Sequence, residues 1–246
     1  MKYRSAEGTT RQLRKPSKLR KEPVQRKNRR ASAIQPPQFA AGLAPDPAPP
    51  DALEPGASYA QRIWQGLRFD AAEAEDVSLE GLDVRGGNFQ EACLPLLQVA
   101  DCRFDATDLA SCALEKAYLR RVELLGCRLV GVKLNEADLQ DVLFARCSAR
   151  LARFWNMRGA AVRFEQCALQ EASFEGANLA GAVFARCDLS GADLRNTNLA
   201  GADLRGSTLA GIRVNAKDLK GAIVDAAQAV ELIGLFGVKV LADEAA

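Results

Sequence analysis

A large apolar residue recurs at every fifth position between residues 79 and 224. The series starts at Leu79, and 28 of its 30 positions are Leu, Phe or Val, the exceptions being Ala149 and Gly159. Average composition would place these three residue types at roughly a quarter of positions or fewer. We refer to the recurring positions as the centres. A fixed period without insertions predicts a repeat architecture, in which each unit repeats one structural step.

A second column of small or aliphatic residues lies two positions before the centres, for example at Cys127, Ala137 and Ala192. An α-helix would scatter the centres around its axis, because five residues turn through about 500°. A long straight strand would change face at each odd step. We therefore expect each unit to be a short extended side that ends at a corner, with both columns inward. Cys127, Cys147, Cys167 and Cys187 recur at intervals of 20 residues, which predicts four sides per circuit.

Several units resemble the pentapeptide-repeat proteins, whose unit is roughly Ala-Asp/Asn-Leu-x-x. The match is clearest at residues 177–181, 192–196 and 202–206, and about 150 residues share the period. The resemblance implies an all-β fold, a right-handed quadrilateral parallel β-helix. It says much less about function, because one fold can carry unrelated functions. The family includes proteins that protect topoisomerases by imitating DNA, so a DNA-mimicking, gyrase-binding protein that confers drug resistance is one alternative.

Composition divides the chain into five segments. Residues 1–40 are basic and lack apolar periodicity, and are predicted to be a disordered tail. Residues 41–57 contain five prolines and are predicted to be an extended linker. Residues 58–68 are predicted to form a short N-terminal helical cap, and residues 69–224 the β-helix. Residues 225–246 are predicted to form a C-terminal helix and cap.

The C-terminal segment has the pattern of a helix followed by a short strand. Asp225 can begin a helix that ends near Leu235, and Val238 and Val240 alternate as in a strand. The expected apolar face of the helix consists of Ala226, Ala229, Val230 and Ile233. This element is expected either to cover the open edge of the sheet or to join two copies as a homodimer.

The first 40 residues carry 12 Lys or Arg and only two acidic residues. Such a basic segment is expected to contact nucleic acid or another polyanion, with affinity that depends on salt. A solubilising tail and a targeting segment are the other interpretations. The candidate polyanion-binding residues are Arg11, Arg14, Lys15, Lys18, Arg20, Lys21, Arg26, Lys27, Arg29 and Arg30.

Cysteine usage and the absence of histidine exclude several functional classes. Six of the seven cysteines fall in the inward small-residue column, which indicates buried, reduced thiols and a cytoplasmic location. There is no histidine and no Cys-x-x-Cys pair, so no metal site or other cofactor is expected. The chain has no signal-peptide pattern and no apolar run long enough to span a membrane. No catalytic residues are predicted.

One circuit, from about residue 142 to 164, breaks the regular pattern. It contains five arginines and no acidic residue, whereas the repeats on both sides of it are net acidic. Exposed Trp beside Arg is typical of protein-binding hot spots, although a weakened circuit with solvated charges is the alternative. The sequence thus favours a non-enzymatic scaffold that binds a protein partner of unknown identity. The candidate partner-binding residues are Leu143, Arg146, Arg150, Leu151, Arg153, Trp155, Arg158 and Arg163.

Overall fold

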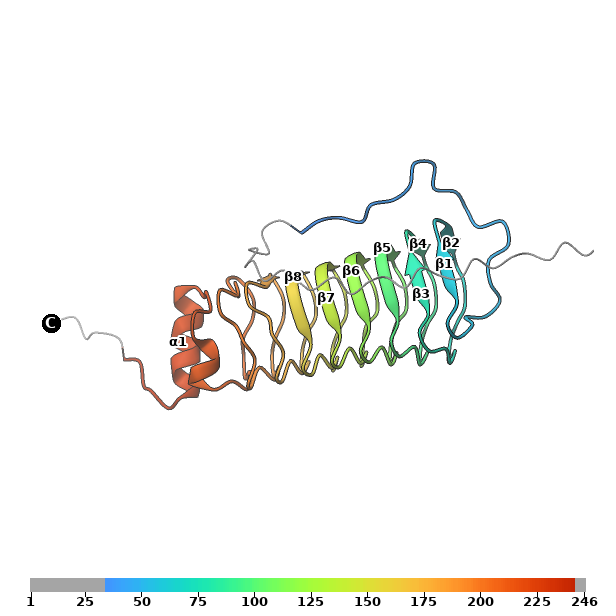
Figure 1. The fold of residues 1–246 in the computed structure, drawn as a ribbon. Helices are drawn as coiled ribbons and strands as arrows, with labels where there is room; N and C mark the ends of the chain where they lie inside the picture. The colour runs from blue at the N-terminus through green and yellow to red at the C-terminus, as the bar shows by residue number, and fades with distance from the viewer. Residues whose placement is uncertain (1–33, 242–246) are drawn as a thin grey trace, which may run out of the picture.

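The computed structural model describes residues 34–241, and the strands in this range all pair in parallel. Paired residues are 20 apart from the first strand to the last, as for Phe104 and Leu124. The strands are β1 (Ser58–Ala60), β2 (Ile63–Gln65), β3 (Ser78–Glu80), β4 (Asp83–Arg85), β5 (Gln98–Asp105), β6 (Tyr118–Leu125), β7 (Asp138–Ala145), β8 (Arg158–Glu165) and β9 (Val183–Ala185). They stack as successive circuits of a parallel β-helix (Figure 1).

Each circuit has four sides, as the 20-residue interval predicts. In the circuits up to β8, two sides are formed by the strands, and the other two by single bridges such as Asn88–Asp108 and Cys93–Ala113. We number the sides by the centre that each carries in the circuit beginning at Ser78. Side 1 carries Leu79, side 2 Val84, side 3 Phe89 and side 4 Leu94.

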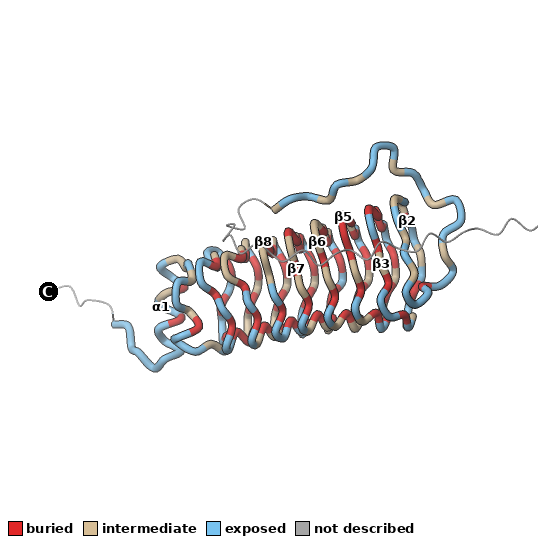
Figure 2. Tube along the Cα trace, viewed as in Figure 1, coloured by how far each residue is buried: buried red, intermediate tan, exposed pale blue. Residues whose placement is uncertain are grey.

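Both inward columns form the core, as predicted from the sequence. Buried and exposed positions alternate along every circuit (Figure 2), which is the outcome of residues two apart sharing a face. Aromatic rings stack along the axis on two sides. The ring centroids of Phe164 lie 4.7 Å from Phe144 and 5.0 Å from Phe184 on side 2, and those of Phe154 and Phe174 lie 4.7 Å apart on side 4.

The space beside the irregular centre Gly159 is filled by its neighbours, and the other irregular centre, Ala149, is buried. A Cβ atom on Gly159 would lie 3.0 Å from Val162 Cγ2 and 3.2 Å from the carbonyl oxygen of Asn178. Met157, which takes the place of a small residue in the inward column, is fully buried in the same circuit. The circuit with Ala149 and Gly159 is therefore packed, which disfavours its interpretation as a weakened part of the repeat.

The cysteines lie as the small-residue column predicts. Six are buried in the core, and Cys93 is exposed. Their thiols donate to backbone carbonyls, for example from Cys147 to Leu124 at 3.3 Å. Burial raises the pKa of Cys102 and Cys112 to about 12, so these thiols stay protonated and act as small apolar side chains.

The N-terminal end differs from the prediction. Residues 58–68 do not form a helix: they contain β1 and β2, which are the first two sides of the β-helix. The centre period explains the error, because Tyr59 and Trp64 are in phase with it. The ring of Trp64 packs edge-on against Tyr59 and tilted against Phe69, at 5.3 Å and 5.7 Å between ring centroids. Burial of Trp64 in the core, with Tyr59 packed against it, outweighs the weak helical pattern of so short a segment.

The segment before β1 closes the N-terminal end. Pro45 bridges to Ile63, and Trp64 Nε1 donates to Asp46 Oδ2 at 3.1 Å. Leu53 is buried against the core. Parts of the predicted linker thus belong to the body of the protein, and residues 34–40 of the predicted disordered tail dock on it as well. Residues 1–33, where the rest of that prediction falls, lie outside the described part.

The C-terminal helix begins where the sequence predicts. Asp225 precedes α1 (Ala226–Leu235) and accepts from the backbone N–H of Gln228 at 3.0 Å. Before it, the repeat loses its strict geometry at a 3-10 helix, η1 (Ala216–Leu219). Figure 1 shows α1 lying across the C-terminal end of the β-helix.

The predicted apolar face of α1 is wrong. Gln228 and Leu232 are buried, whereas Val230 and Ile233 are 50% and 42% exposed. The last circuit presents backbone carbonyls, and Gln228 Nε2 satisfies two of them, donating to Leu204 and Ser207 at 2.7 Å each. An amide is therefore preferred there to an apolar side chain. The strand predicted around Val238 is absent, since residues 238–241 are coil.

Candidate partner-binding site

The eight candidate partner-binding residues surround the shaft and do not converge. Arg158 lies on side 1, Leu143 and Arg163 on side 2, and Arg150 on side 3. Arg146 and Leu151 occupy corner positions with positive φ, at 54° and 58°. Arg153 and Trp155 share side 4 with Leu151 at its edge. The charge of +5 in this circuit is thus a belt around the β-helix.

The arginines of the belt differ in their partners. Arg158 forms an ion pair with Asp138 at 3.5 Å, and Arg163 pairs with Glu165. Arg146, Arg150 and Arg153 make no ion pair within residues 34–241. Exposed pairs of this kind contribute little to stability, so the belt is not needed to hold the fold together.

Asp188 shows the electrostatic effect of the belt on side 3. A hydrogen bond from the Ser190 hydroxyl is the main cause of its lowered pKa, and the charge of Arg150 lowers it further, against the effect of burial. Asp188 is thus ionised and bound to its neighbours, with Gln170 Nε2 donating at 2.6 Å. Its carboxylate has the environment of a structural group rather than of an acid catalyst.

Three of the candidates form a compact exposed group on side 4. Trp155 is 41% exposed and Leu151 is 51% exposed. The Arg153 guanidinium carbon lies 5.4 Å from the Trp155 ring centroid, within the range of a cation–π contact. Trp155 Nε1 donates to the Ser173 hydroxyl at 2.6 Å, which fixes the indole on the next circuit. We refer to Leu151, Arg153 and Trp155 as the Trp155 site.

The backbone beneath the Trp155 site is rigid. Arg153 bridges to the circuits before and after it, at Lys133 and Ser173. Between the exposed side chains, Ala152 and Phe154 point into the core and are fully buried. A preformed aromatic platform of this kind loses little conformational entropy when a partner binds.

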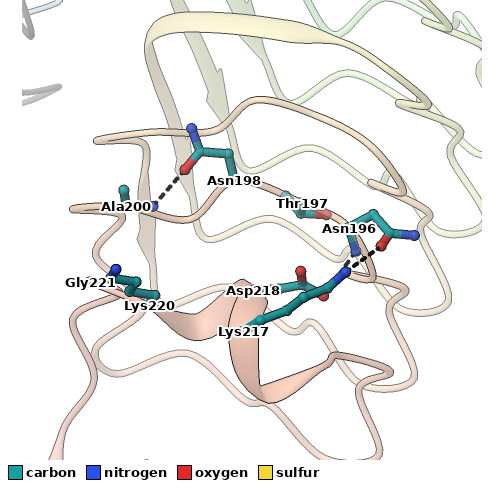
Figure 3. Close-up of a pocket in the computed structure, with 8 residues that line it drawn as sticks. All are labelled: Asn196, Thr197, Asn198, Ala200, Lys217, Asp218, Lys220 and Gly221. Carbon is teal, nitrogen blue, oxygen red and sulfur yellow. Dashed lines mark hydrogen bonds between the residues drawn. The ribbon is translucent and has the colours of Figure 1, made fainter.

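A hollow lies near the C-terminal end, between η1 and the last circuits (Figure 3). Asn196 N donates to Asp218 Oδ2 at 2.9 Å, and Lys217 Nζ donates to Asn196 Oδ1 at 3.4 Å. Burial raises the pKa of Asp218, but hydrogen bonds from Asn215 and Asn196 outweigh this and lower it. The Asp218 carboxylate is therefore ionised, and its hydrogen bonds to Asn196 and Asn215 attach η1 to the last circuits. Its lining residues are Asn196, Thr197, Asn198, Ala200, Lys217, Asp218, Lys220 and Gly221.

The described residues form neither a metal cluster nor a membrane-spanning helix. Among residues 34–241, no group of three or more His, Cys, Asp or Glu side chains is placed to hold a metal ion. In the same range, none of the helices has the length and hydropathy needed to cross a membrane. The candidate polyanion-binding residues, from Arg11 to Arg30, lie outside the described part and stay a prediction.

The fold and the five-residue period define a class, the quadrilateral β-helices built from tandem pentapeptides. The family model for pentapeptide repeats matches eight copies, over residues 102–141, 156–196 and 172–211. These matched segments are pentapeptide repeats of that family. No curated protein matches the sequence.

Two solved structures are similar to this chain at low identity and low TM-score. QnrB1, a plasmid-mediated fluoroquinolone resistance protein, is 19% identical, with a TM-score of 0.40 over 77% of this chain and 97% of that protein. HetL, which is involved in regulating heterocyst differentiation in the cyanobacterium Nostoc sp. strain PCC 7120, is 21% identical, with a TM-score of 0.38 over 68% and 89%. Likeness at this level carries no argument about the partner of this chain.

Proposed function

We propose that this chain is a non-enzymatic scaffold that binds a protein partner through the Trp155 site. The observation that carries the proposal is the exposed Trp155 ring, held by Ser173 and covered on one side by Arg153. The core does not require an aromatic residue at this outward position. Trp and Arg are the residues most enriched in binding hot spots, and a rigid platform suits them.

The chemistry of the site indicates the kind of partner surface. Leu151 and Trp155 offer apolar area, and Arg153 offers a guanidinium group without an ion-pair partner among the described residues. Lys133, in register on the neighbouring circuit, adds a second positive charge. A partner surface with an apolar centre and a nearby carboxylate is the best complement to this arrangement.

The structure gives less support to DNA mimicry of the kind that would bind gyrase. A mimic needs a continuous acidic surface, and many carboxylates along this β-helix are paired with arginines. Asp101 pairs with Arg121, Asp193 with Arg195 at 2.7 Å. The belt of five arginines then interrupts what negative charge remains.

The double substitution R153E/W155A tests the Trp155 site. We expect it to weaken partner binding by more than tenfold per lost hot-spot residue, since each is worth about 2 kcal/mol or more. The measurement is quantitative affinity purification with the full chain as bait, followed by titration of each captured protein. Because both side chains are exposed, thermal unfolding should change little.

The matched control is R186E, a charge reversal at an exposed corner position away from side 4. A protein that binds the Trp155 site is lost with R153E/W155A and retained with R186E. If both variants capture the same proteins with the same affinity as the original chain, the Trp155 site is not the partner-binding site.

We also propose that α1 joins two copies of the chain. Its outward face exposes Val230 and Ile233, and Phe236, directly after the helix, is exposed as well, while Gln228 and Leu232 hold the helix to the β-helix. A symmetric dimer would bury this apolar face. We expect sedimentation to show a dimer at micromolar concentration, and V230K/I233K to show a monomer with unchanged circular dichroism. A monomeric original chain would contradict the proposal.

The basic segment is the third part of the proposed function. Its ten candidate residues would add salt-dependent affinity for a polyanion near the partner, without base specificity.

A further inference from the structure

Residues 34–46 run along the outside of the β-helix, across successive circuits (Figure 1). The segment is held by side chains at the corner between sides 1 and 2. The backbone N–H of Gln38 donates to Asp101 Oδ1 at 2.9 Å, and that of Gln35 donates to Asp141 Oδ1 at 3.2 Å. The N–H of Ala40 donates to Gln61 Oε1 at 3.2 Å. Most hydrogen bonds that hold the segment thus come from its own backbone.

The spacing of the two carboxylates matches the spacing of the two donors. Asp101 and Asp141 are separated by two circuits, about 9.6 Å at the strand spacing of about 4.8 Å. Gln35 and Gln38 are three residues apart, about 9.3 Å in a polyproline II helix with its rise of about 3.1 Å per residue. That helix has three residues per turn, so both N–H groups face the same corner.

The sequence between the donors favours this conformation. Pro36 and Pro37 have fixed φ and lack an N–H, so no donor between Gln35 and Gln38 is left without an acceptor. The residue before a proline is also restricted to extended conformations, which covers Gln35 and Pro36. The Gln-Pro-Pro-Gln sequence therefore holds its two N–H donors at a fixed spacing, and its backbone loses little conformational entropy when it binds.

The corner has the burial and charge of a formed site. Asp101 and Asp141 are only 6% and 4% exposed, although they occupy outward corner positions. Arg121, between them, forms an ion pair with Asp101. Burial raises the pKa of Asp101, but Arg121 and the N–H of Gln38 outweigh it and lower the pKa, so the acceptor is ionised. Hydrogen bonds to ionised acceptors are stronger than neutral ones.

An aromatic contact adds selectivity at one end. The Arg103 guanidinium carbon lies 5.5 Å from the Phe39 ring centroid, and Arg103 is itself held by Glu123 at 2.9 Å. A ligand with an aromatic residue directly after the second donor gains a cation–π contact.

The site has a defined length. After Asp141, the same corner carries Ala161, Gly181 and Gly201, none of which has a side-chain acceptor. Before Asp101 it carries Gly81, and before that Gln61, which accepts from Ala40. The two carboxylates therefore bind a segment of about four residues rather than an indefinite strand.

We propose that the corner formed by Asp101, Arg121 and Asp141 is a binding site for an extended Pro-Pro peptide, and that residues 34–40 occupy it as a displaceable ligand within the chain. The ligand class is a peptide with two backbone N–H donors flanking two prolines, followed by an aromatic residue. Release would not open the N-terminal end, because Pro45 and Asp46 are fixed separately to Ile63 and Trp64. Gly42, with φ of 77°, lies between the two attachments and can serve as the hinge.

The test removes the two donors without disturbing the peptide conformation. Q35P/Q38P in the full chain eliminates both N–H groups and retains the polyproline conformation, whereas the matched control Q35A/Q38A retains both donors. A fluorescein-labelled peptide of residues 34–43 reports whether the corner is free. The original chain should bind it weakly, because the attached segment competes at an effective concentration on the order of millimolar.

We expect Q35P/Q38P to bind the labelled peptide at least tenfold more tightly than the original chain, and Q35A/Q38A to behave like the original chain. The amide of Ala40 should also exchange faster with solvent in Q35P/Q38P alone. Equal peptide binding by all three proteins would overturn the proposal. The proposal would also be overturned if Q35P/Q38P bound a control peptide, with Pro in place of both Gln residues, as tightly as the peptide of residues 34–43. The control peptide lacks the two N–H donors.

Discussion

The substitution F164A is expected to lower the free energy of unfolding by about 3–5 kcal/mol, the usual cost of truncating a buried Phe to Ala. Phe164 is fully buried at the middle of the side 2 stack. It loses its stacked contacts with Phe144 and Phe184 and its edge contacts with Phe154 and Phe174, at 6.0 Å and 5.9 Å. Urea unfolding followed by circular dichroism measures the change.

The repeat geometry makes this loss hard to relieve. Each circuit is fixed by hydrogen bonds to the circuits on both sides, so the backbone cannot close around the cavity. Stability in a repeat array is approximately a sum of terms between neighbouring circuits. The loss at Phe164 therefore weakens two interfaces in the middle of the array, and we expect unfolding to become less cooperative.

Phe104 is the matched control in the same column of centres. Its ring contacts Phe89 edge-on at 6.5 Å, and its neighbours in the column are Val84 and Leu124. F104A thus removes a buried ring without removing an aromatic stack, and aromatic pairs add about 0.5–1.5 kcal/mol beyond burial. F164A should be the more destabilising of the two. A loss below about 1 kcal/mol for F164A would contradict the role assigned to the stack.

The five-residue period was sufficient to predict the core, because the geometry of each five-residue unit alone determines which of its side chains point inward. A residue such as Leu129 or Phe164 points inward from the geometry of its own unit, and the 20-residue interval then places it over its counterpart. Long-range pairing and local pattern agree at every circuit, so little tertiary information is needed.

The structure of the two ends could not be predicted in the same way. At each end, the conformation of the chain depends on how the open edge of the outermost circuit is covered. At the N-terminal end, Trp64 continues the core, although residues 58–68 read as a weak helix. At the C-terminal end, free carbonyls select Gln228 over an apolar residue. These requirements come from unpaired backbone groups, which residue hydropathy does not represent.

Of the candidate site, the sequence predicted the exposed Trp155 and the charge of the belt but not their arrangement. The sequence places all five arginines in one circuit. Because the chain turns at each corner, they lie on different sides, and among them Arg153 contacts the Trp155 ring. The docked segment at Asp101 and Asp141 was missed. Its signal was present in Gln-Pro-Pro-Gln, but the matching acceptors lie 63 and 106 residues further along the chain.

Neutralising the basic segment is expected to have the largest effect on binding. If about six of its Lys and Arg residues contact phosphates, affinity for duplex DNA should fall by about 10³ between 50 and 200 mM salt. The slope of log K against log salt would be about −0.9 per contact. Replacing the ten candidate residues, from Arg11 to Arg30, with Gln in the full chain should bring that slope close to zero.

The belt around the β-helix provides the matched comparison for the basic segment. The triple substitution R146Q/R150Q/R158Q also removes positive charge, but these arginines lie on different sides of the shaft, and Arg158 is already paired with Asp138. A single duplex cannot contact all of them at once, so the slope should change by less than one contact. If the belt variant loses the salt dependence and the tail variant retains it, the polyanion-binding surface is on the β-helix and the basic segment is not the arm.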